Sequence, residues 1–352
     1  MENKKYRVAQ WITGHTGINQ LKKIIEHPRL ELVGVHVHSE EKIGKDAGDI
    51  AGTEKTGVIA TNSIEDILAV KPDCVCYSSM TTMANIDEIC QFLKNGSNVV
   101  TITTDFAFHH PDSLDPEIRQ KIEAACEEGN TSLFASGVSP GFVQENLLLA
   151  VLGQMRRIDS ITIYEFGDMR PRHDSPDMIA MMFGQSPEIM NMGEKAISGM
   201  QLVGFGPSLR MIMDAIGMPL DDVTSVTKFP VAKETFTLAN TLIEKGKVAA
   251  YQGTVAGIRD GKEVIKFCFN WYSTPDLDDE VLPMRDTGWR IVVEGDVLHK
   301  LDIYQDPDPV RFKQVQPGYN GNMAVNSIIH TCEAKPGIRT LVDMPLIVPY
   351  FS

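Results

Sequence analysis

The feature that most constrains this chain is a regular alternation of strand-like and helix-like segments over its first 135 residues. Apolar runs typical of buried strands are separated by single segments with the 3.6-residue period of a helix. Because each crossover helix returns the chain to the same edge, such strands pair in parallel. The pattern predicts a doubly wound α/β domain with strands at Tyr6–Ile12, Leu30–His38, Val58–Ala60, Cys74–Tyr77, Asn98–Thr103 and Thr131–Ala135.

A glycine-containing turn directly follows the first strand and opens the first helix. Gly14 permits a tight turn, and Gly17 lets the helix approach the strand, so that the helix N-terminus can hold a pyrophosphate. This context predicts a Rossmann-type dinucleotide-binding domain, although an ordinary strand-to-helix turn would show the same glycines. The predicted cofactor-binding residues of the turn are Thr13, Gly14, His15, Thr16 and Gly17.

The end of the second strand bears on the choice between NAD and NADP. An NAD-selective site usually places an acidic residue there, but this chain has His38 followed by Ser39. The Ser39 hydroxyl and the Lys42 ammonium suit a 2′-phosphate, so NADP is the preferred cofactor. NAD stays possible because Glu40 or Glu41 could hold a ribose hydroxyl, and Lys42 could be a solvated surface charge.

Ligands of such sheets bind at the carboxyl ends of the strands. Further cofactor contacts are therefore predicted in the loops after later strands, at Ser78, Thr103, Gly137, Ser139 and Pro140. The Gly and Pro residues between positions 137 and 141 fix a backbone path that could position the nicotinamide carboxamide. A plain strand–helix connection is the alternative for this segment.

The pattern changes after about residue 150. Two predicted hairpins pair Val248–Ile258 with Val264–Tyr272, and Trp289–Val293 with Val297–Tyr304. Together with a strand at Ser160–Phe166 and helices at Pro207–Ile216 and Asn322–Glu333, they predict a second, α+β domain on an open mixed or antiparallel sheet. The predicted domains are a dinucleotide-binding domain at 1–145, rejoined by 320–352, and a substrate and dimerisation domain at 146–319.

Composition narrows the function classes. The formal net charge of −14 opposes general binding to nucleic acid or anionic membrane. No apolar run is long enough to span a bilayer and the N-terminus does not resemble a signal peptide, so a cytoplasmic protein is expected. The six cysteines form no Cys-x-x-Cys pair, so buried thiols are expected and no metal site is predicted.

Three segments carry a resemblance to a known family: Val8–Gly17, Ser136–Phe142 and Asp343–Pro345. The chain resembles the dihydrodipicolinate reductase-related family over nearly its whole length, and within it the branch of 2,4-diaminopentanoate dehydrogenases and native amine dehydrogenases. The resemblance implies a Rossmann-type domain, a second domain with an open mixed sheet, a cleft between them, and a homodimer. It also implies hydride transfer between a nicotinamide and a C=N or C=C bond.

Two departures from the family pattern affect the expected chemistry. The amine dehydrogenase branch carries a Glu after the strand at Asn98–Thr103, whereas this chain has Asp105 near that place. Dihydrodipicolinate reductases carry a His-His pair and a Lys after the first strand of the second domain. Here that stretch contains Arg172 and His173 without the pair or the Lys, so dihydrodipicolinate is not expected as the substrate.

Three acid–base candidates follow. Asp105 is the first, because it lies on a loop at the carboxyl edge of the sheet, and His109 and His173 are the others. Methionines clustered between residues 178 and 213 could line a pocket for a mainly hydrophobic substrate, or fill a core or dimer interface. We expect hydride transfer to or from a small amine or imine; a carbonyl or ene reductase, and a non-catalytic dinucleotide-binding protein, are the alternatives.

Overall fold

The computed structural model describes residues 4–79, 86–102, 106–171, 179–180, 182–278, 283–305 and 308–351. The chain divides into two compact units, which are described separately. Unit 1 comprises Met1–Asn146 and Pro317–Ser352, and unit 2 comprises Leu147–Gln316. Within the ranges given above, none of the helices combines the length and the apolar character needed to cross a membrane.

Unit 1 is built on a six-stranded sheet in the order β14-β5-β4-β3-β1-β2, in which every pair is parallel. The short, apolar strand sequences are those of a sheet covered on both faces. Its strands are β1 (Tyr6–Trp11), β2 (Leu30–His36), β3 (Cys74–Tyr77), β4 (Asn98–Thr101), β5 (Ser132–Ala135) and β14 (Gly337–Arg339).

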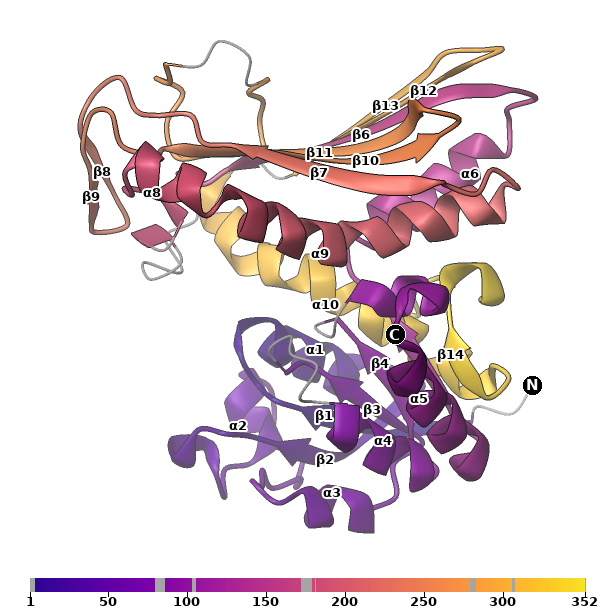
Figure 1. Cartoon of the computed structure of the whole chain (residues 1–352). Helices are drawn as coiled ribbons and strands as arrows, with labels where there is room; N and C mark the ends of the chain where they lie inside the picture. Colours follow the sequence, from indigo (N-terminus) through magenta and orange to yellow (C-terminus); the bar gives the residue numbers. More distant parts are fainter. Residues whose placement is uncertain are drawn as a thin grey trace. The chain divides into compact units, whose positions relative to one another are not determined.

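Helices cover both faces of this sheet (Figure 1). One core joins Val75 and Val99 to Ile67, Ile89 and Ile122, which lie on α3, α4 and α5. A second core joins β-strand residues to Ile24 of α1 and to the buried side of α10, and a third lies between Leu21 of α1 and α2. The helices are α1 (His15–Glu26), α2 (Ala47–Ala51), α3 (Ile64–Ala69), α4 (Ile86–Lys94), α5 (Pro116–Gly129) and α10 (Pro309–Glu333), whose residues from Pro317 onward belong to unit 1.

Unit 2 is built on a mixed six-stranded sheet in the order β13-β12-β6-β11-β10-β7. Only the β6–β11 pair in this sheet is parallel, and the predicted hairpins are β10–β11 and β12–β13. The strands are β6 (Ile158–Asp168), β7 (Asp222–Lys228), β10 (Ala250–Arg259), β11 (Lys262–Tyr272), β12 (Gly288–Gly295) and β13 (His299–Tyr304), with a separate hairpin of β8 (Phe236–Leu238) and β9 (Thr241–Ile243).

The helices of unit 2 are α6 (Leu148–Leu152), α8 (Pro187–Met192) and α9 (Glu194–Ala215). Figure 1 shows α9 lying along one face of the mixed sheet. Phe205 of α9 packs there against Phe267 and Phe269 of β11, with ring centroids 4.6 and 5.9 Å away. The predicted fold class, a Rossmann-type α/β domain followed by an α+β domain on an open mixed sheet, is confirmed.

Two predicted helices are longer than expected, and one predicted strand is not a strand of the sheet. The helix predicted at Pro207–Ile216 is the end of α9, which continues through Pro207 because its buried face packs on the sheet. The helix predicted at Asn322–Glu333 is the end of α10, whose first half is too polar to show an apolar period. Val58–Ala60 forms only an isolated bridge, between Ile59 and Asp46, and is not a strand of the sheet.

Candidate dinucleotide site

The turn after β1 is shaped by a close approach between α1 and the strand. A Cβ on Gly17 would lie 2.2 Å from the Ile12 carbonyl oxygen, so only glycine fits without moving the backbone. Ile12 itself has a φ of 70°, which is rare and costly for a β-branched residue. A Cβ on Gly14, in contrast, would meet no described atom within 4 Å. The turn therefore leaves no room for a side chain at Gly17, whereas the space beside Gly14 is open.

The N-terminus of α1 has the properties of an anion site. Its N-cap is Gly14, no described side chain caps it, and the first turn carries no acidic residue. Thr13 is buried, while His15 is exposed and Thr16 is partly exposed. A helix of 12 residues with an uncapped N-terminus offers backbone N–H groups and a positive dipole end to a phosphate. The five predicted turn residues thus lie together at an uncapped helix N-terminus, and their contact with a pyrophosphate stays a prediction.

Three aromatic rings lie side by side where β1, β2 and β3 end. The Trp11 ring stacks on His36 at a centroid distance of 3.7 Å and faces Tyr77 at 6.1 Å. Burial lowers the pKa of His36 to about 4; a hydrogen bond that the ring donates to the Asn62 backbone opposes this shift, and the nearby His38 adds to it. His36 is therefore neutral near pH 7, and the last residue of β2 contributes no carboxylate to a ribose.

Lys42 contacts the turn after β1. Its Nζ donates to the Thr13 carbonyl oxygen at 2.8 Å, and the side chain is only partly exposed. No carboxylate lies within ion-pairing distance of Lys42 in the described part of the chain. Ser39 opens the short 3₁₀ turn Glu40–Lys42, and its carbonyl accepts from the Lys42 backbone N–H at 2.9 Å. Ser39, Lys42 and Thr13 therefore form one polar margin beside the turn.

A buried polar cluster supports the turn from inside. Gln10 and Gln20 are fully buried, and Gln10 Nε2 donates to the Ile12 carbonyl at 3.0 Å and to Gln20 Oε1 at 3.2 Å. The Ser78 hydroxyl donates to Gln20 Oε1 as well. The predicted cofactor residue Ser78 thus points its hydroxyl toward this cluster, and its contact with a cofactor stays a prediction. The glutamines were missed, because a lone Gln in an apolar strand gives no local signal.

The turn after β5 is the second tight turn at the carboxyl edge. It contains a cis Ser139–Pro140 peptide bond, and Gly141 has a φ of 122°. A Cβ on Gly141 would lie 2.3 Å from the Gly137 carbonyl oxygen. The Ser139 hydroxyl accepts from Nε2 of the buried Gln144 at 2.9 Å, and the Val138 N–H donates to Asn320 Oδ1 at 3.0 Å. Side-chain amides therefore hold this turn.

A π-helix at Phe142–Leu147 follows directly and buries two consecutive polar side chains, Gln144 and Glu145. Glu145 Oε1 lies 2.7 Å from His109 Nδ1, and the two side chains are 2% and 4% exposed. His109 ends the 3₁₀ turn Phe106–His109, which follows β4 in the chain. The ring is thus inside the fold beside a carboxylate that the sequence analysis missed, and its catalytic role stays a prediction.

Unit 2 also places a carboxylate among aromatic rings. The indole N–H groups of Trp271 and Trp289 donate to the two oxygens of Glu165, at 3.0 and 2.8 Å. The Trp271 ring can lie across β6 because Gly167 has no Cβ there, where one would be 2.6 Å from the ring. Two of the chain's three tryptophans therefore orient one glutamate on the sheet.

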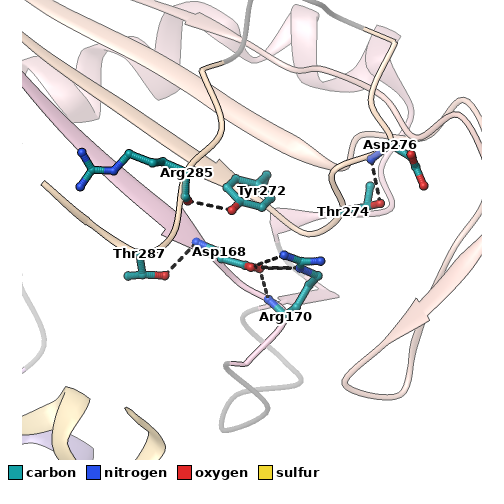
Figure 2. A network of polar contacts seen from close by, with 7 residues as sticks. All are labelled: Asp168, Arg170, Tyr272, Thr274, Asp276, Arg285 and Thr287. Carbon is teal, nitrogen blue, oxygen red and sulfur yellow. Dashed lines mark hydrogen bonds and ion pairs between the residues drawn. The ribbon is translucent and has the colours of Figure 1, made fainter. Parts of the chain in front are cut away.

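A second polar network lies where β6 ends (Figure 2). Arg170 donates from Nε and Nη2 to both oxygens of Asp168, whose backbone N–H donates to the Thr287 hydroxyl at 3.1 Å. The Tyr272 hydroxyl donates to the Arg285 carbonyl at 2.8 Å, and burial raises the pKa of Tyr272 to about 12. The bidentate pair fixes the Arg170 guanidinium while leaving its side chain half exposed.

Several predicted site residues lie outside the described residues. They are the catalytic candidates Asp105 and His173, their neighbour Arg172, and the cofactor candidate Thr103. The described candidates Thr13, Gly14, His15, Thr16 and Gly17 lie on the first turn, with Ser39 and Lys42 beside it. Gly137, Ser139 and Pro140 lie on the second. Both turns follow strands of the same parallel sheet, at its carboxyl edge.

Two family profiles match the chain, one after the other. Residues 12–136 match the dihydrodipicolinate reductase N-terminus, and residues 142–351 match the 2,4-diaminopentanoate dehydrogenase C-terminal domain. The second match alone covers more than half of the 352 residues.

Full-length relatives are similar in both units. An amine dehydrogenase from Streptomyces virginiae is 28% identical over 345 residues, which cover 96% of this chain and 95% of that protein. A 2,4-diaminopentanoate dehydrogenase from Acetoanaerobium sticklandii is 24% identical, with 97% and 94% covered. Among solved structures, an amine dehydrogenase from Mycobacterium smegmatis superimposes with a TM-score of 0.77 at 17% identity, covering 98% of this chain and 97% of that one.

Proposed function

Because the chain belongs to the family defined by the 2,4-diaminopentanoate dehydrogenase C-terminal domain, we propose that it is an NADP(H)-dependent amine dehydrogenase that acts on a small, mainly hydrophobic substrate. The resemblance stated from the sequence is confirmed, and the protein is an NAD(P)-dependent oxidoreductase of the CH–NH₂ class. The observation that carries the proposal is the pair of profile matches, which together extend over residues 12–136 and 142–351.

The preference for NADP over NAD is supported by the margin of the first turn. Lys42 Nζ uses one donor on the Thr13 carbonyl at 2.8 Å, and an ammonium has three. A 2′-phosphate beside Ser39 would accept from Lys42 and the serine hydroxyl together. The strand that would carry the ribose-binding acid of an NAD site ends in the neutral His36 instead.

The proposed reaction is reductive amination and its reverse. A ketone or aldehyde and ammonia condense to an imine and release water; one hydride and one proton then reduce the imine to the amine. When bound, the nicotinamide supplies the hydride. We propose that Thr13–Gly17 hold the pyrophosphate and that the Gly137–Pro140 turn orients the carboxamide. Asp105 is proposed to exchange the proton with the substrate nitrogen, with His109 and His173 as further candidates.

The proposal extends to assembly. Ile189, Met192 and Met200 on α8 and α9 are 61%, 87% and 68% exposed. Flexible apolar side chains at a surface suit contact with a second apolar surface. We propose that the protein is a homodimer, and size-exclusion chromatography with light scattering would test this oligomeric state. We also propose that it is cytoplasmic.

The test is NADPH oxidation at 340 nm with a panel of small ketones and aldehydes, with and without ammonium. We expect turnover that requires ammonium and that falls at least 100-fold in Asp105→Asn, because general acid–base catalysis contributes roughly 10²–10⁴-fold. Turnover without ammonium would replace amine chemistry with carbonyl reduction. Binding of NADPH with no turnover over the panel would contradict the proposal and favour a non-catalytic dinucleotide-binding protein.

A further inference from the structure

Asn320 connects the last helix to the second tight turn. Its Oδ1 accepts the backbone N–H of Val138 at 3.0 Å, across 182 positions of the sequence. It also lies directly over Gly137, where a Cβ would come within 3.3 Å of the same Oδ1. Both residues belong to unit 1, so this contact is internal to the dinucleotide-binding unit.

The next residue of α10 touches the first turn's helix. A Cβ on Gly321 would lie 2.9 Å from Cγ of Gln20 and 3.5 Å from Cγ2 of Thr16, both on α1. Two consecutive residues of α10 therefore contact the two segments that border the carboxyl edge of the sheet. One segment begins after β1 and would hold the pyrophosphate, and the other begins after β5.

The Asn320 amide is oriented by this arrangement. Because the Val138 N–H needs an acceptor, the oxygen of the amide must face it, and the NH₂ group takes the other side. The side chain is partly exposed, and over the ranges that the structure describes no protein acceptor is recorded for Asn320 Nδ2. A donor held in place at the edge of a binding turn is suited to a ligand acceptor.

The nearby Ser139 points to the same ligand group. Its hydroxyl accepts from Gln144 Nε2 at 2.9 Å, so the hydroxyl proton is directed elsewhere. When a dinucleotide lies with its pyrophosphate on α1 and its adenosine ribose at the end of β2, the nicotinamide half extends toward β4 and β5. The acceptor that this half offers at its tip is the carboxamide oxygen.

We propose that Asn320 is a cofactor-binding residue, whose Nδ2 donates a hydrogen bond to the carboxamide oxygen of the nicotinamide while its Oδ1 holds the Val138 N–H. The inference rests on the proposed dinucleotide function and adds a residue that neither sequence motif contains. It gives α10 a role beyond packing, because the helix then carries one side of the nicotinamide site.

The variant Asn320→Asp separates the two roles of this side chain. Aspartate keeps an acceptor for the Val138 N–H, so the turn is retained, but it replaces the donating NH₂ group with an oxygen. The matched control is Asn322→Asp, which adds the same charge two residues later at an exposed position of the same helix. Isothermal titration calorimetry of each full-length protein would use NADPH and 2′-phospho-ADP-ribose, which lacks the nicotinamide.

We expect Asn320→Asp to weaken NADPH binding about 10-fold or more, because a buried carboxamide oxygen would lose its donor and meet a carboxylate. Binding of 2′-phospho-ADP-ribose should change less than about twofold, and Asn322→Asp should leave both ligands within about twofold of wild type. Equal losses for both ligands, or no loss for NADPH, would overturn the inference. A wild-type protein that binds neither ligand would overturn the proposed function, whereas normal 2′-phospho-ADP-ribose binding in every variant preserves it.

Discussion

The two tight turns of unit 1 lie at the same sheet edge but take support from segments at different distances along the chain. In the turn after β1, Gly17 fits against Ile12 because it has no Cβ, and Lys42 donates to the Thr13 carbonyl from 29 positions away. The turn after β5 takes its support from Gln144 on the following π-helix and from Asn320, 182 positions beyond Val138. The hydrogen bonds that support the first turn therefore come from residues within the first 78 positions, whereas the second turn also needs α10, which returns from the far end of the sequence.

The two turns also differ in the substitutions that they can tolerate. The first turn is open toward Gly14, where added atoms meet no protein atom, and is closed only at Gly17. In the second turn the positive φ and the close contact coincide at one residue, because Gly141 has a φ of 122° and lies over the Gly137 carbonyl. Substitutions at these glycines test the comparison most directly.

The largest effect is expected for Gly141→Ala. Its Cβ would lie 2.3 Å from the Gly137 oxygen in a backbone conformation that alanine avoids. Strain of about 1–3 kcal/mol and overpacking of about 1–3 kcal/mol would together lower the free energy of unfolding of unit 1 by about 3 kcal/mol or more. Urea denaturation followed by circular dichroism measures this loss.

The control for that substitution is Gly44→Ala, which has a φ of 77° but no atom within 4 Å of the added Cβ. It should cost about 1 kcal/mol, from the backbone conformation alone. If Gly141→Ala costs no more than Gly44→Ala, the contact between Gly137 and Gly141 does not fix the second turn.

The next largest effect is expected at the first turn, where Gly17→Ala and Gly14→Ala form a pair. Gly17→Ala must move α1 away from Ile12 and should destabilise the protein by about 2 kcal/mol. Gly14→Ala should leave thermal stability within about 0.5 kcal/mol, because its Cβ meets no described atom. We expect both to weaken NADPH binding at least 10-fold, since a methyl at Gly14 would occupy space needed by the pyrophosphate. Unchanged NADPH affinity in Gly14→Ala would show that the ligand does not approach this turn.

Lys42→Ala tests the polar margin of the first turn. Removal of a charge-assisted contact to a 2′-phosphate should weaken NADPH binding about 10-fold and leave NADH binding nearly unchanged. Lys45→Ala is the control, because Lys45 is an exposed lysine three residues later. An equal loss for NADPH and NADH would mean that Lys42 supports the turn through the Thr13 carbonyl and does not select the cofactor.

Features that neighbouring residues determine could be predicted from the sequence, and features that distant segments determine could not. The strand–helix alternation, Gly17 and the two hairpins are local patterns, and the structure contains them. Glu145, Asn320 and the tryptophan-bound Glu165 acquire their surroundings only when distant segments meet, so no local period or spacing marks them. The early start of α10 was missed for a related reason, because a polar half-helix shows no apolar period.

The smallest effect concerns pH and the three neighbouring rings of Trp11, His36 and Tyr77 at the strand ends. Burial lowers the pKa of His36 from 6.5 to about 4, so the unfolded chain binds a proton more readily than the folded one between these values. The stabilisation is therefore complete above about pH 6.5 and is lost as the pH falls toward 4. Because one pKa unit corresponds to about 1.4 kcal/mol, we expect wild type to lose about 1–2 kcal/mol more than His36→Phe between pH 7 and pH 5.

Phenylalanine keeps a ring against Trp11 without a proton to gain, and His27, whose pKa is also lowered to about 4, contributes equally to both proteins. Parallel stability curves for the two proteins, measured by urea denaturation, would contradict a neutral, buried His36. A steeper acid loss in NADPH affinity for wild type than for the variant would tie this ring to the first turn, since Trp11 and His36 end the two strands that flank it.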